Sequence, residues 1–354
     1  MMQNWVTQAI SRIEADFKRS SDTHLLKVEL PAVKNISLYL KDESTHPTGS
    51  LKHRLARSLF LYGLCNGQIN ENSGSVRSVS EAAAISDESF ERLLGLPFIA
   101  VVPKNTSQEK IDEITFYNGQ CHLVEAKDIY SEAARLALEL KGHYMDQFTF
   151  AERATDWRGN NNIAESIFSQ MSSEPFPKPS WIVVSAGTGG TSATIGRYIR
   201  YKCYPTQLCV ADPAHSVFFD YYQTGDKTLV SDHGSMIEGI GRPRVEPSFI
   251  SSIVDKMIKV PDAASFATIH FMEKILNRRC GGSTGTNLYA AFQIISDLNA
   301  QNQEGSVVSM ICDGGERYLD TYYNNQWLEE NGFDTAPYRK QLEQFYETGF
   351  LKTI

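Results

Sequence analysis

Short β-branched runs alternate with helix-forming stretches along most of this chain, from about residue 98 onward. Apolar runs bounded by turn residues predict strands, whereas apolar residues at helical spacing predict helices. The predicted strands are 98–102, 121–125, 181–185, 208–212 and 307–312, and the predicted helices are 108–118, 130–141 and 193–201. Because strands that alternate with helices form βαβ units, this order predicts an α/β fold around a mostly parallel sheet.

The bulk properties of the chain exclude several classes of protein. A length of 354 residues predicts roughly two domains. The net charge of −8 argues against nucleic acid as a partner, since phosphate contacts need a basic surface. No stretch approaches the run of about 18 apolar residues that a membrane span needs, and residues 1–20 lack the apolar core of a secretory signal. We therefore expect a cytoplasmic protein without a membrane partner.

The six cysteines are scattered along the chain without the C-x-x-C spacing of a metal site. They are Cys65, Cys121, Cys203, Cys209, Cys280 and Cys312. A structural zinc site is therefore not expected, and neither is a disulfide framework in a chain of this length. We expect no bound metal and interpret Cys280 as a packed thiol.

A glycine-rich loop follows the predicted strand 181–185 and precedes the predicted helix 193–201. Such a loop directs backbone N–H groups toward a ligand at the helix N-terminus, where the helix dipole favours anions. Glycines let the backbone approach the ligand closely, and hydroxyl groups add donors. The candidate phosphate-binding residues are Gly187, Thr188, Gly189, Gly190 and Thr191, with Ser192 as a further hydroxyl.

Two familiar nucleotide-binding loops fit this segment less well. A dinucleotide fingerprint needs G-x-G-x-x-G, but the last position counted from Gly187 is Ser192. A nucleotide P-loop ends in Gly-Lys-Ser/Thr, and this loop contains no lysine. A tight turn that uses glycine for packing alone stays open.

A second dense segment surrounds Lys52. Residues 47–49 predict a turn, and Ser50 can cap the helix that follows. Lys52 then lies in the first helical turn, where the helix dipole disfavours a cation and so favours the neutral amine of a nucleophile. A solvated surface lysine is the alternative. His46 and His53 are expected to position or cap this segment rather than to act as bases.

The residues around Lys52 resemble the P-[ST]-G-S-x-K-x-R motif of the fold-type II pyridoxal-phosphate enzymes, the cysteine synthase superfamily. In that family the lysine carries the cofactor as a Schiff base, so the resemblance implies that role for Lys52. Four more segments are similar to family motifs in the same order: 187–191 to the phosphate cup, 238–241 to the G-I-G loop, 281–285 to G-x-S-x-G, and 314–318 to S-G-E-R-Y. The resemblance places Ser283 at the pyridine nitrogen of pyridoxal 5′-phosphate, which serves as the electron sink.

The resemblance also implies the fold of these enzymes, which is that of the tryptophan synthase β-subunit. That fold consists of two parallel-sheet α/β domains with the cofactor in the cleft between them. For this chain the implied boundaries are 1–56 and 159–354 for a large cofactor-binding domain, and 57–158 for a small inserted domain that closes over substrate. Relatives of this fold type are usually homodimers, so we expect a homodimer by analogy.

Longer stretches resemble one branch of the family, which contains bacterial L-cysteine desulfhydrases. These stretches are 42–47, 146–160, 238–247 and 318–323. The branch implies pyridoxal-phosphate-dependent β-elimination on L-cysteine or a related β-substituted amino acid, giving sulfide, pyruvate and ammonia, with Lys52 removing the α-proton. β-Replacement, as in cysteine or cystathionine synthesis, stays open because both reactions share one intermediate.

The chain departs from the family at the loop that holds the substrate carboxylate. The family has Ser/Thr-Gly-Asn/Ser-Thr there, and this chain aligns Ser80, Glu81, Ala82 and Ala83 with it. Glu81 puts an anion where a carboxylate binds, and like charges in a desolvated pocket repel. An alternative alignment uses residues 73–75. A cofactor-binding protein with weak catalysis and a regulatory role therefore stays open. The other candidates for substrate binding are Gly239, Ile240 and Gly241.

Two further stretches are open to more than one interpretation. The aromatic run 218–222 predicts core or dimer contact rather than a ligand-binding site. The asparagine run 160–162 is polar enough to line a cleft, and it is equally typical of a helix-capping turn.

Overall fold

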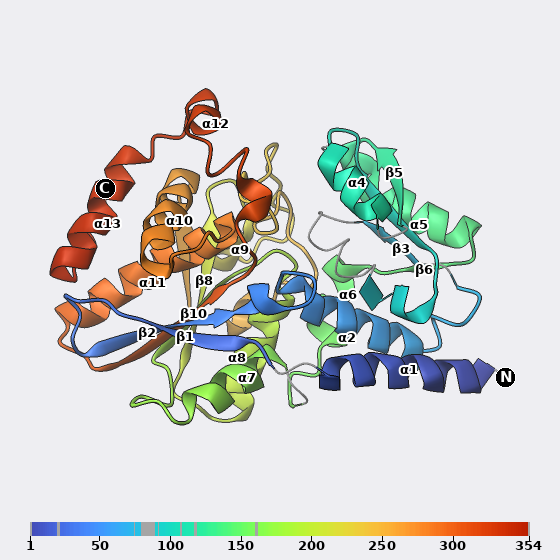
Figure 1. Ribbon diagram of the computed structural model, residues 1–354, viewed down its shortest axis with the longest axis horizontal. Coiled ribbons are helices and arrows are strands. Elements are labelled where there is room, and N and C mark those ends of the chain that lie inside the picture. The colour runs from blue at the N-terminus through green and yellow to red at the C-terminus, as the bar shows by residue number, and fades with distance from the viewer. Residues whose placement is uncertain are drawn as a thin grey trace. The chain divides into compact units, whose positions relative to one another are not determined.

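The computed structural model describes residues 2–19, 22–73, 75–78, 89–90, 92–106, 108–116, 119–159 and 162–352. The chain divides into two compact units, which Figure 1 draws in one view. Unit 1 comprises Met1–Asp22 and His46–Thr155, and unit 2 comprises Thr23–Thr45 and Asp156–Ile354. Within the described ranges, no helix is both long and apolar enough to span a membrane. The domain boundaries inferred from the resemblance, after residues 56 and 158, stay a prediction.

Unit 2 is built on a six-stranded sheet. Its strands lie in the order β1 (His24–Val28), β2 (Ile36–Asp42), β10 (Gly305–Ile311), β7 (Trp181–Ser185), β8 (Gln207–Pro213) and β9 (Lys256–Val260). The β1–β2 pair is antiparallel, and the other neighbours are parallel. The parallel register sets Leu38 opposite Val307. The prediction of an α/β fold with a mostly parallel sheet is confirmed.

Helices cover both faces of this sheet (Figure 1). One face carries α7 (Ile163–Met171) and α8 (Gly190–Tyr201), and the other carries α10 (Asp262–Leu276), α11 (Gly282–Ala300) and α13 (Ala336–Thr348). Unit 2 also contains two shorter helices, α9 (Phe218–Thr224) and α12 (Asn325–Glu330). α11 packs on β7, β8 and β10 and against α10, so most of its residues are buried. Because the inner strands are covered on both faces, they read as continuous apolar runs in the sequence.

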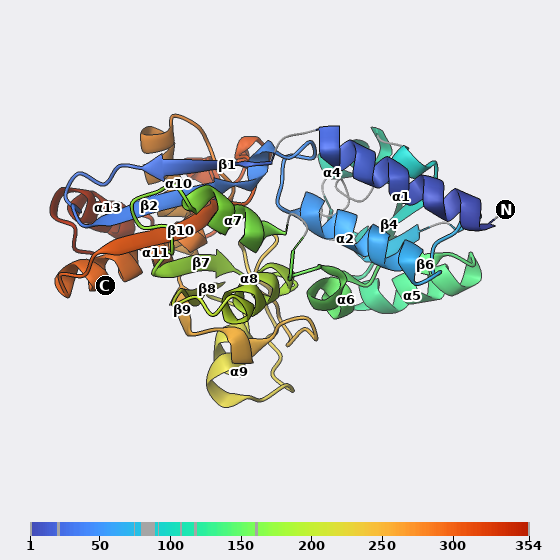
Figure 2. The same cartoon turned by 90° about the horizontal axis from the view of Figure 1, so that it is seen from below.

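Unit 1 contains a four-stranded sheet whose described pairs are all parallel. Its strands lie in the order β5 (Gln120–Val124), β4 (Phe98–Pro103), β3 (Ser75–Ser78) and β6 (His143–Tyr144). Its helices are α1 (Met2–Arg19), α2 (Lys52–Cys65), α4 (Gln108–Phe116), α5 (Ile129–Glu139) and α6 (Gln147–Ala154). Figure 2 shows α1 alongside α2, and Ile13, Ala56 and Phe60 are buried in their common core. This packing accounts for the place of the first helix in unit 1.

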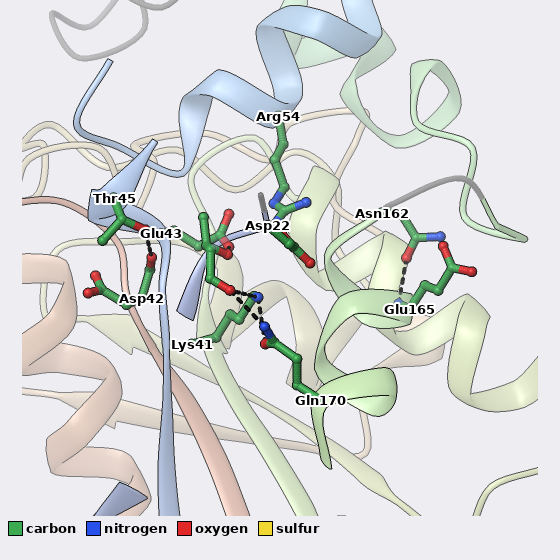
Figure 3. A network of polar contacts seen from close by, with 10 residues as sticks. Asp22, Lys41, Asp42, Glu43, Thr45, Arg54, Asn162, Glu165 and Gln170 are labelled. Carbon is green, nitrogen blue, oxygen red and sulfur yellow. Dashed lines mark hydrogen bonds and ion pairs between the residues drawn. The ribbon is translucent and has the colours of Figure 1, made fainter. Parts of the chain in front are cut away.

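Two charged residues are fully buried within unit 2, Lys41 near the end of β2 and Glu43 in the 3-10 helix that follows, and Figure 3 shows both with their partners. The ammonium group of Lys41 donates to the carbonyl of Thr23 and to Oε1 of Gln170, both at 2.7 Å. The carboxylate of Glu43 accepts the Thr23 hydroxyl at 2.7 Å. Buried charges need such partners, so this network fixes the chain at Thr23, where unit 2 begins.

The structure decides between the interpretations of both ambiguous stretches. Phe218 is fully buried and stacks on Phe249 with ring centroids 4.2 Å apart, so this part of the aromatic run belongs to the core. Asn162 is the N-cap of α7, and its side chain accepts the N–H of Glu165 at 3.0 Å (Figure 3). The capping interpretation is confirmed for Asn162, whereas residues 160 and 161 lie outside the described part of the chain.

Candidate functional site

The glycine-rich loop lies in unit 2, between the end of β7 and the start of α8. The helix begins at Gly190, earlier than the predicted start at 193, with Gly189 as a left-handed N-cap at φ +88°. A Cβ on Gly189 would lie 2.6 Å from Cα of Phe249, so glycine alone fits this turn. The hydroxyl of Ser192 donates to the carbonyl of Gly189 at 3.0 Å, which further fixes the loop.

The start of α8 fits an anion such as phosphate. The structure describes all of α8, and its first turn contains no acidic side chain. The first N–H groups of a helix have no partner inside the helix, and the positive end of the helix dipole lies there. Thr188 and Thr191 add hydroxyl groups beside these donors. The chemistry of the loop therefore suits a phosphate group.

The predicted substrate loop 238–241 directly contacts the glycine-rich loop. The N–H of Gly241 donates to the carbonyl of Ala186 at 2.8 Å. A Cβ on Gly187 would lie 2.2 Å from the carbonyl oxygen of Gly239. The two backbones meet so closely that no side chain fits at Gly187.

Ser283 lies in the first turn of α11 and is almost fully buried. Next to it, the hydroxyl of Thr284 accepts the N–H of Cys312 at 3.1 Å, and the N–H of Gly281 donates to the carbonyl of Asp313 at 3.2 Å. These bonds tie the start of α11 to the end of β10.

Two stacked tyrosines lie beside the substrate loop. The rings of Tyr318 and Tyr322 are nearly parallel at 8°, with centroids 4.7 Å apart, and Ile237 and Ile240 belong to the same buried cluster. The hydroxyl of Tyr318 donates to Oδ2 of Asp313 at 2.7 Å. Burial raises the pKa of both tyrosines well above its usual range, so their hydroxyl groups keep their protons.

Unit 2 thus brings together three segments that the sequence analysis named separately: the loops 187–191 and 238–241 and the start of α11. Sequence reasoning noted the stretch 318–323 as a resemblance alone and assigned no role to its tyrosines. Tyr318 ends a short 3-10 helix and residues 319–323 form turns, so no helical periodicity in the sequence signals the contact of these two rings.

Lys52 is the first residue of α2 in unit 1, and its side chain is half-buried. The Ser50 hydroxyl oxygen accepts the N–H of Lys52 at 3.3 Å, but the N-cap of α2 is Leu51 rather than the expected Ser50. The rings of His46 and His53 stack with centroids 5.0 Å apart, and His53 also packs against Phe90. These contacts support the positional role expected for the two histidines.

Several predicted positions cannot be placed. Ser80, Glu81, Ala82 and Ala83 lie outside the described residues, as does Gly74 of the alternative alignment. Their roles in substrate binding stay predictions. Among the residues that the structure describes, no group of three or more histidine, cysteine or acidic side chains is arranged to hold a metal ion. Cys280 is buried, and burial raises the pKa of its thiol to about 12.

Comparison with known sequences identifies relatives along nearly the whole chain. Residues 20–313 match the sequence family described as pyridoxal-phosphate dependent enzyme. L-cysteine desulfhydrase Cds1 of Mycobacterium tuberculosis is 55% identical over 350 residues, covering 98% of this chain and 95% of that protein. A cysteine synthase of Dictyostelium discoideum is 24% identical over 329 residues, covering 89% of this chain and 85% of that protein.

Comparison with solved structures agrees with these matches. O-ureido-L-serine synthase superposes with a TM-score of 0.74 at 21% sequence identity, covering 88% of this chain and 93% of that one. This similarity confirms the expected fold class. The matched family range also contains Lys52, the glycine-rich loop and Ser283. The chain belongs to the family of pyridoxal-phosphate dependent enzymes, and pyridoxal 5′-phosphate is its cofactor.

Proposed function

We propose that this enzyme eliminates the thiol group of L-cysteine. L-cysteine and water give sulfide, pyruvate and ammonia: the Cβ–S bond breaks, sulfur leaves with its electron pair, and water replaces nitrogen on the carbon that becomes the pyruvate carbonyl. One observation carries this proposal. A protein named L-cysteine desulfhydrase is 55% identical to this chain, and the match covers 98% of the chain and 95% of that protein.

In this proposal the loop 187–191 binds the cofactor's phosphate through backbone N–H groups at the start of α8. The close backbone approach at Gly187, the left-handed turn at Gly189 and the absence of acidic side chains in the first turn of the described α8 support this role. When bound, pyridoxal 5′-phosphate supplies an electron sink for the carbon from which a proton is removed. Ser283 offers an uncharged hydroxyl group to the cofactor's ring nitrogen. In this family an unprotonated ring nitrogen is associated with elimination and replacement at the β-carbon rather than with transamination.

Lys52 holds the cofactor and acts as the base that takes the substrate's α-proton on Nζ. Its position at the first residue of α2, inside the matched family range, supports this role. Gly239, Ile240 and Gly241 bind the substrate from the loop that adjoins the glycine-rich loop. The segment Ser80–Ala83 is proposed to hold the substrate carboxylate despite its unusual sequence.

The test is to assay sulfide and pyruvate together after L-cysteine is added to the purified holoenzyme. The expected result is equal amounts of both products and a change in the visible absorbance of the bound cofactor. Enzyme stripped of cofactor serves as the control and should release neither product. A holoenzyme that releases no sulfide and shows no spectral change with L-cysteine overturns the proposal.

β-Replacement is the second candidate function, because a relative 24% identical over most of this chain is a cysteine synthase. In that reaction a second nucleophile adds to the carbon from which the leaving group departed. Supplying O-acetylserine with sulfide separates the two reactions by product. L-cysteine would accumulate if replacement dominates, whereas pyruvate would accumulate if elimination dominates.

Weak catalysis in a cofactor-binding regulator is the third candidate. It is favoured by the resemblance, which aligns Glu81, Ala82 and Ala83 with the glycine and hydroxyl positions of the family motif. Changing these three residues to Gly-Ser-Thr should raise turnover if the native loop binds the substrate carboxylate poorly. An unchanged rate would count against this candidate and support the native loop as competent.

We further propose that the enzyme is a homodimer, by analogy with the fold type, and that it acts in the cytoplasm. The net charge of −8 is compatible with a soluble assembly. Light scattering on the purified holoenzyme measures the mass directly. A particle with the mass of one 39.7 kDa chain would overturn the dimer.

A further inference from the structure

We propose that Tyr322 and Tyr323 are positioning residues, and that each holds one functional segment of unit 2 through its hydroxyl group. Tyr322 holds the substrate loop 238–241, and Tyr323 holds the segment that leads to Ser283. This inference rests on the proposed function for the roles of those two segments. The contacts themselves lie entirely within unit 2.

The Tyr322 hydroxyl bridges two backbone groups near the start of the substrate loop. It accepts the N–H of Glu238 at 2.9 Å and donates to the carbonyl of Met236 at 2.8 Å. A hydroxyl group has one proton to donate and lone pairs that accept, and this arrangement uses both. Residues 234–241, all of which the structure describes, contain no helix or strand. The tyrosine therefore supplies bonds that regular structure would otherwise supply.

The neighbouring Tyr323 makes an equivalent arrangement with Cys280. Its hydroxyl accepts the N–H of Cys280 at 2.9 Å and donates to the carbonyl of the same residue at 2.8 Å. Cys280 lies directly before Gly281, the N-cap of α11, and Ser283 follows in the first turn. Fixing both backbone groups of Cys280 fixes the orientation in which the chain enters this helix.

Ring packing holds both hydroxyl groups in place. Tyr322 is buried, stacks on Tyr318 with centroids 4.7 Å apart and lies 4.7 Å from the ring of Phe266. His270 contacts both residues: its Nε2 is 2.8 Å from the Tyr322 carbonyl oxygen, and its ring lies 5.1 Å from that of Tyr323. Rotamers locked by packing are what a positioning residue needs.

The far end of the substrate loop is fixed independently, because the N–H of Gly241 donates to the carbonyl of Ala186 at 2.8 Å. Without the Tyr322 hydroxyl group, the loop would keep this second attachment. The aromatic ring at position 322 would also keep its stacking contacts. Loss of the hydroxyl should therefore loosen one end of the loop and leave the fold in place. The effect then falls on substrate binding, which depends on the loop's geometry.

The adjacent tyrosines permit a matched experiment on the holoenzyme. Tyr322→Phe and Tyr323→Phe each remove one hydroxyl group and keep the ring. Tyr289→Phe is the control, since the buried Tyr289 hydroxyl donates to Oε1 of Gln341 at 2.7 Å and touches neither segment. For each variant we would measure hydrogen exchange, the KM and kcat for L-cysteine, and the dissociation constant of the cofactor.

The two variants should fail in different ways. Tyr322→Phe should speed exchange of the Glu238 amide and raise KM, each about five- to tenfold, with cofactor affinity within about twofold of wild type. Tyr323→Phe should speed exchange of the Cys280 amide and weaken cofactor binding by a similar factor. Tyr289→Phe should lower the melting temperature alone.

Two results would overturn the inference. One is that Tyr322→Phe and Tyr323→Phe change KM and cofactor affinity alike. The other is that neither differs from Tyr289→Phe. A wild-type enzyme that releases no sulfide would overturn the proposed function and not this inference. Amide exchange and cofactor affinity, measured on the same variants, would still decide whether the tyrosines hold their segments.

Discussion

The carbonyl oxygen of Gly239 lies 2.2 Å from the point that a Cβ on Gly187 would occupy. Carbon and oxygen atoms that are not bonded cannot approach so closely. The nearest atoms are the carbonyl oxygen and carbon of Gly239, which belong to the backbone and have little freedom to move. The glycine-rich loop and the substrate loop therefore depend on each other for their positions.

Gly187→Ala should separate these loops and weaken cofactor binding by at least about tenfold, which corresponds to roughly 1.4 kcal/mol. Dialysis followed by measurement of the cofactor's visible absorbance gives the affinity. Gly159→Ala is the matched control, since its Cβ would meet no described atom within 4 Å. Equal cofactor affinity in the two variants would contradict the contact.

Lys52→Ala should lower sulfide release by about 10²- to 10⁴-fold, the usual contribution of a positioned base. The helix should survive, because alanine is a strong helix former and Lys52 lies at the first position of α2. Lys104→Ala is the control: that lysine is exposed and pairs with the exposed Glu125 at 2.9 Å. Circular dichroism separates lost chemistry from lost structure. A Lys52→Ala enzyme with near-normal turnover would remove Lys52 from the mechanism.

Asp212 should make stability depend on pH. Burial raises the pKa of its carboxyl group to about 7, and its Oδ2 accepts the N–H of Phe219 at 2.8 Å. An unfolded aspartate has a pKa near ~4, so between about pH 4 and 7 the folded state holds a proton that the unfolded state has released. The free energy of unfolding therefore falls as pH rises through this window and levels off above it.

Asp212→Asn removes this titration, so its melting temperature relative to wild type should rise between about pH 5 and pH 8. Thermal unfolding across that range measures the difference. Asp297→Asn, which removes an exposed carboxylate paired with Lys256, is the control for the loss of a surface charge. A melting-temperature difference for Asp212→Asn that stays constant across this range would mean that Asp212 is ionised throughout.

Gln170→Ala should destabilise unit 2 through the buried Lys41. The variant removes the Oε1 acceptor that lies 2.7 Å from the ammonium group, and a buried donor that loses a partner costs about 1–3 kcal/mol. Urea unfolding gives the free energy change. Gln303→Ala is the control, because the side chain of this exposed glutamine donates to Oε1 of Gln301 at 3.0 Å and no buried charge depends on that bond. An unfolding free energy equal to that of the control would show that Lys41 gains no stability from Gln170.

The three strands that the sequence predicted in unit 2 all lie inside the six-stranded sheet, between two neighbouring strands. The predicted strand 181–185 matches β7 in full, and 208–212 and 307–312 match β8 and β10 apart from their ends. β2 escaped prediction because its last residues, Lys41 and Asp42, are charged yet buried through ion pairs and hydrogen bonds. Such burial depends on tertiary partners that a local pattern does not contain.

In the candidate site, too, local features of the sequence could be predicted, whereas contacts between distant residues could not. The glycine-rich loop was predicted because its glycines, between a strand and a helix, are local features of the sequence, whereas Ser283 was predicted from the resemblance of 281–285 to a family motif. The contacts of Tyr322 with Met236 and Glu238 join residues far apart along the chain, so periodicity and motif spacing do not reveal them. Lys52 was predicted from its motif, and its chemistry awaits the substitution described above.

The parallel pairing of β2 with β10 has a consequence for synthesis of the chain. β2 can form its antiparallel pair with β1 early, but its other edge pairs with residues 305–311. Translation must therefore pass residue 311 before that edge is covered, and an uncovered apolar strand edge is prone to pair with other chains. The nascent protein should depend on chaperones until β10 emerges, and fragments that end before it should aggregate.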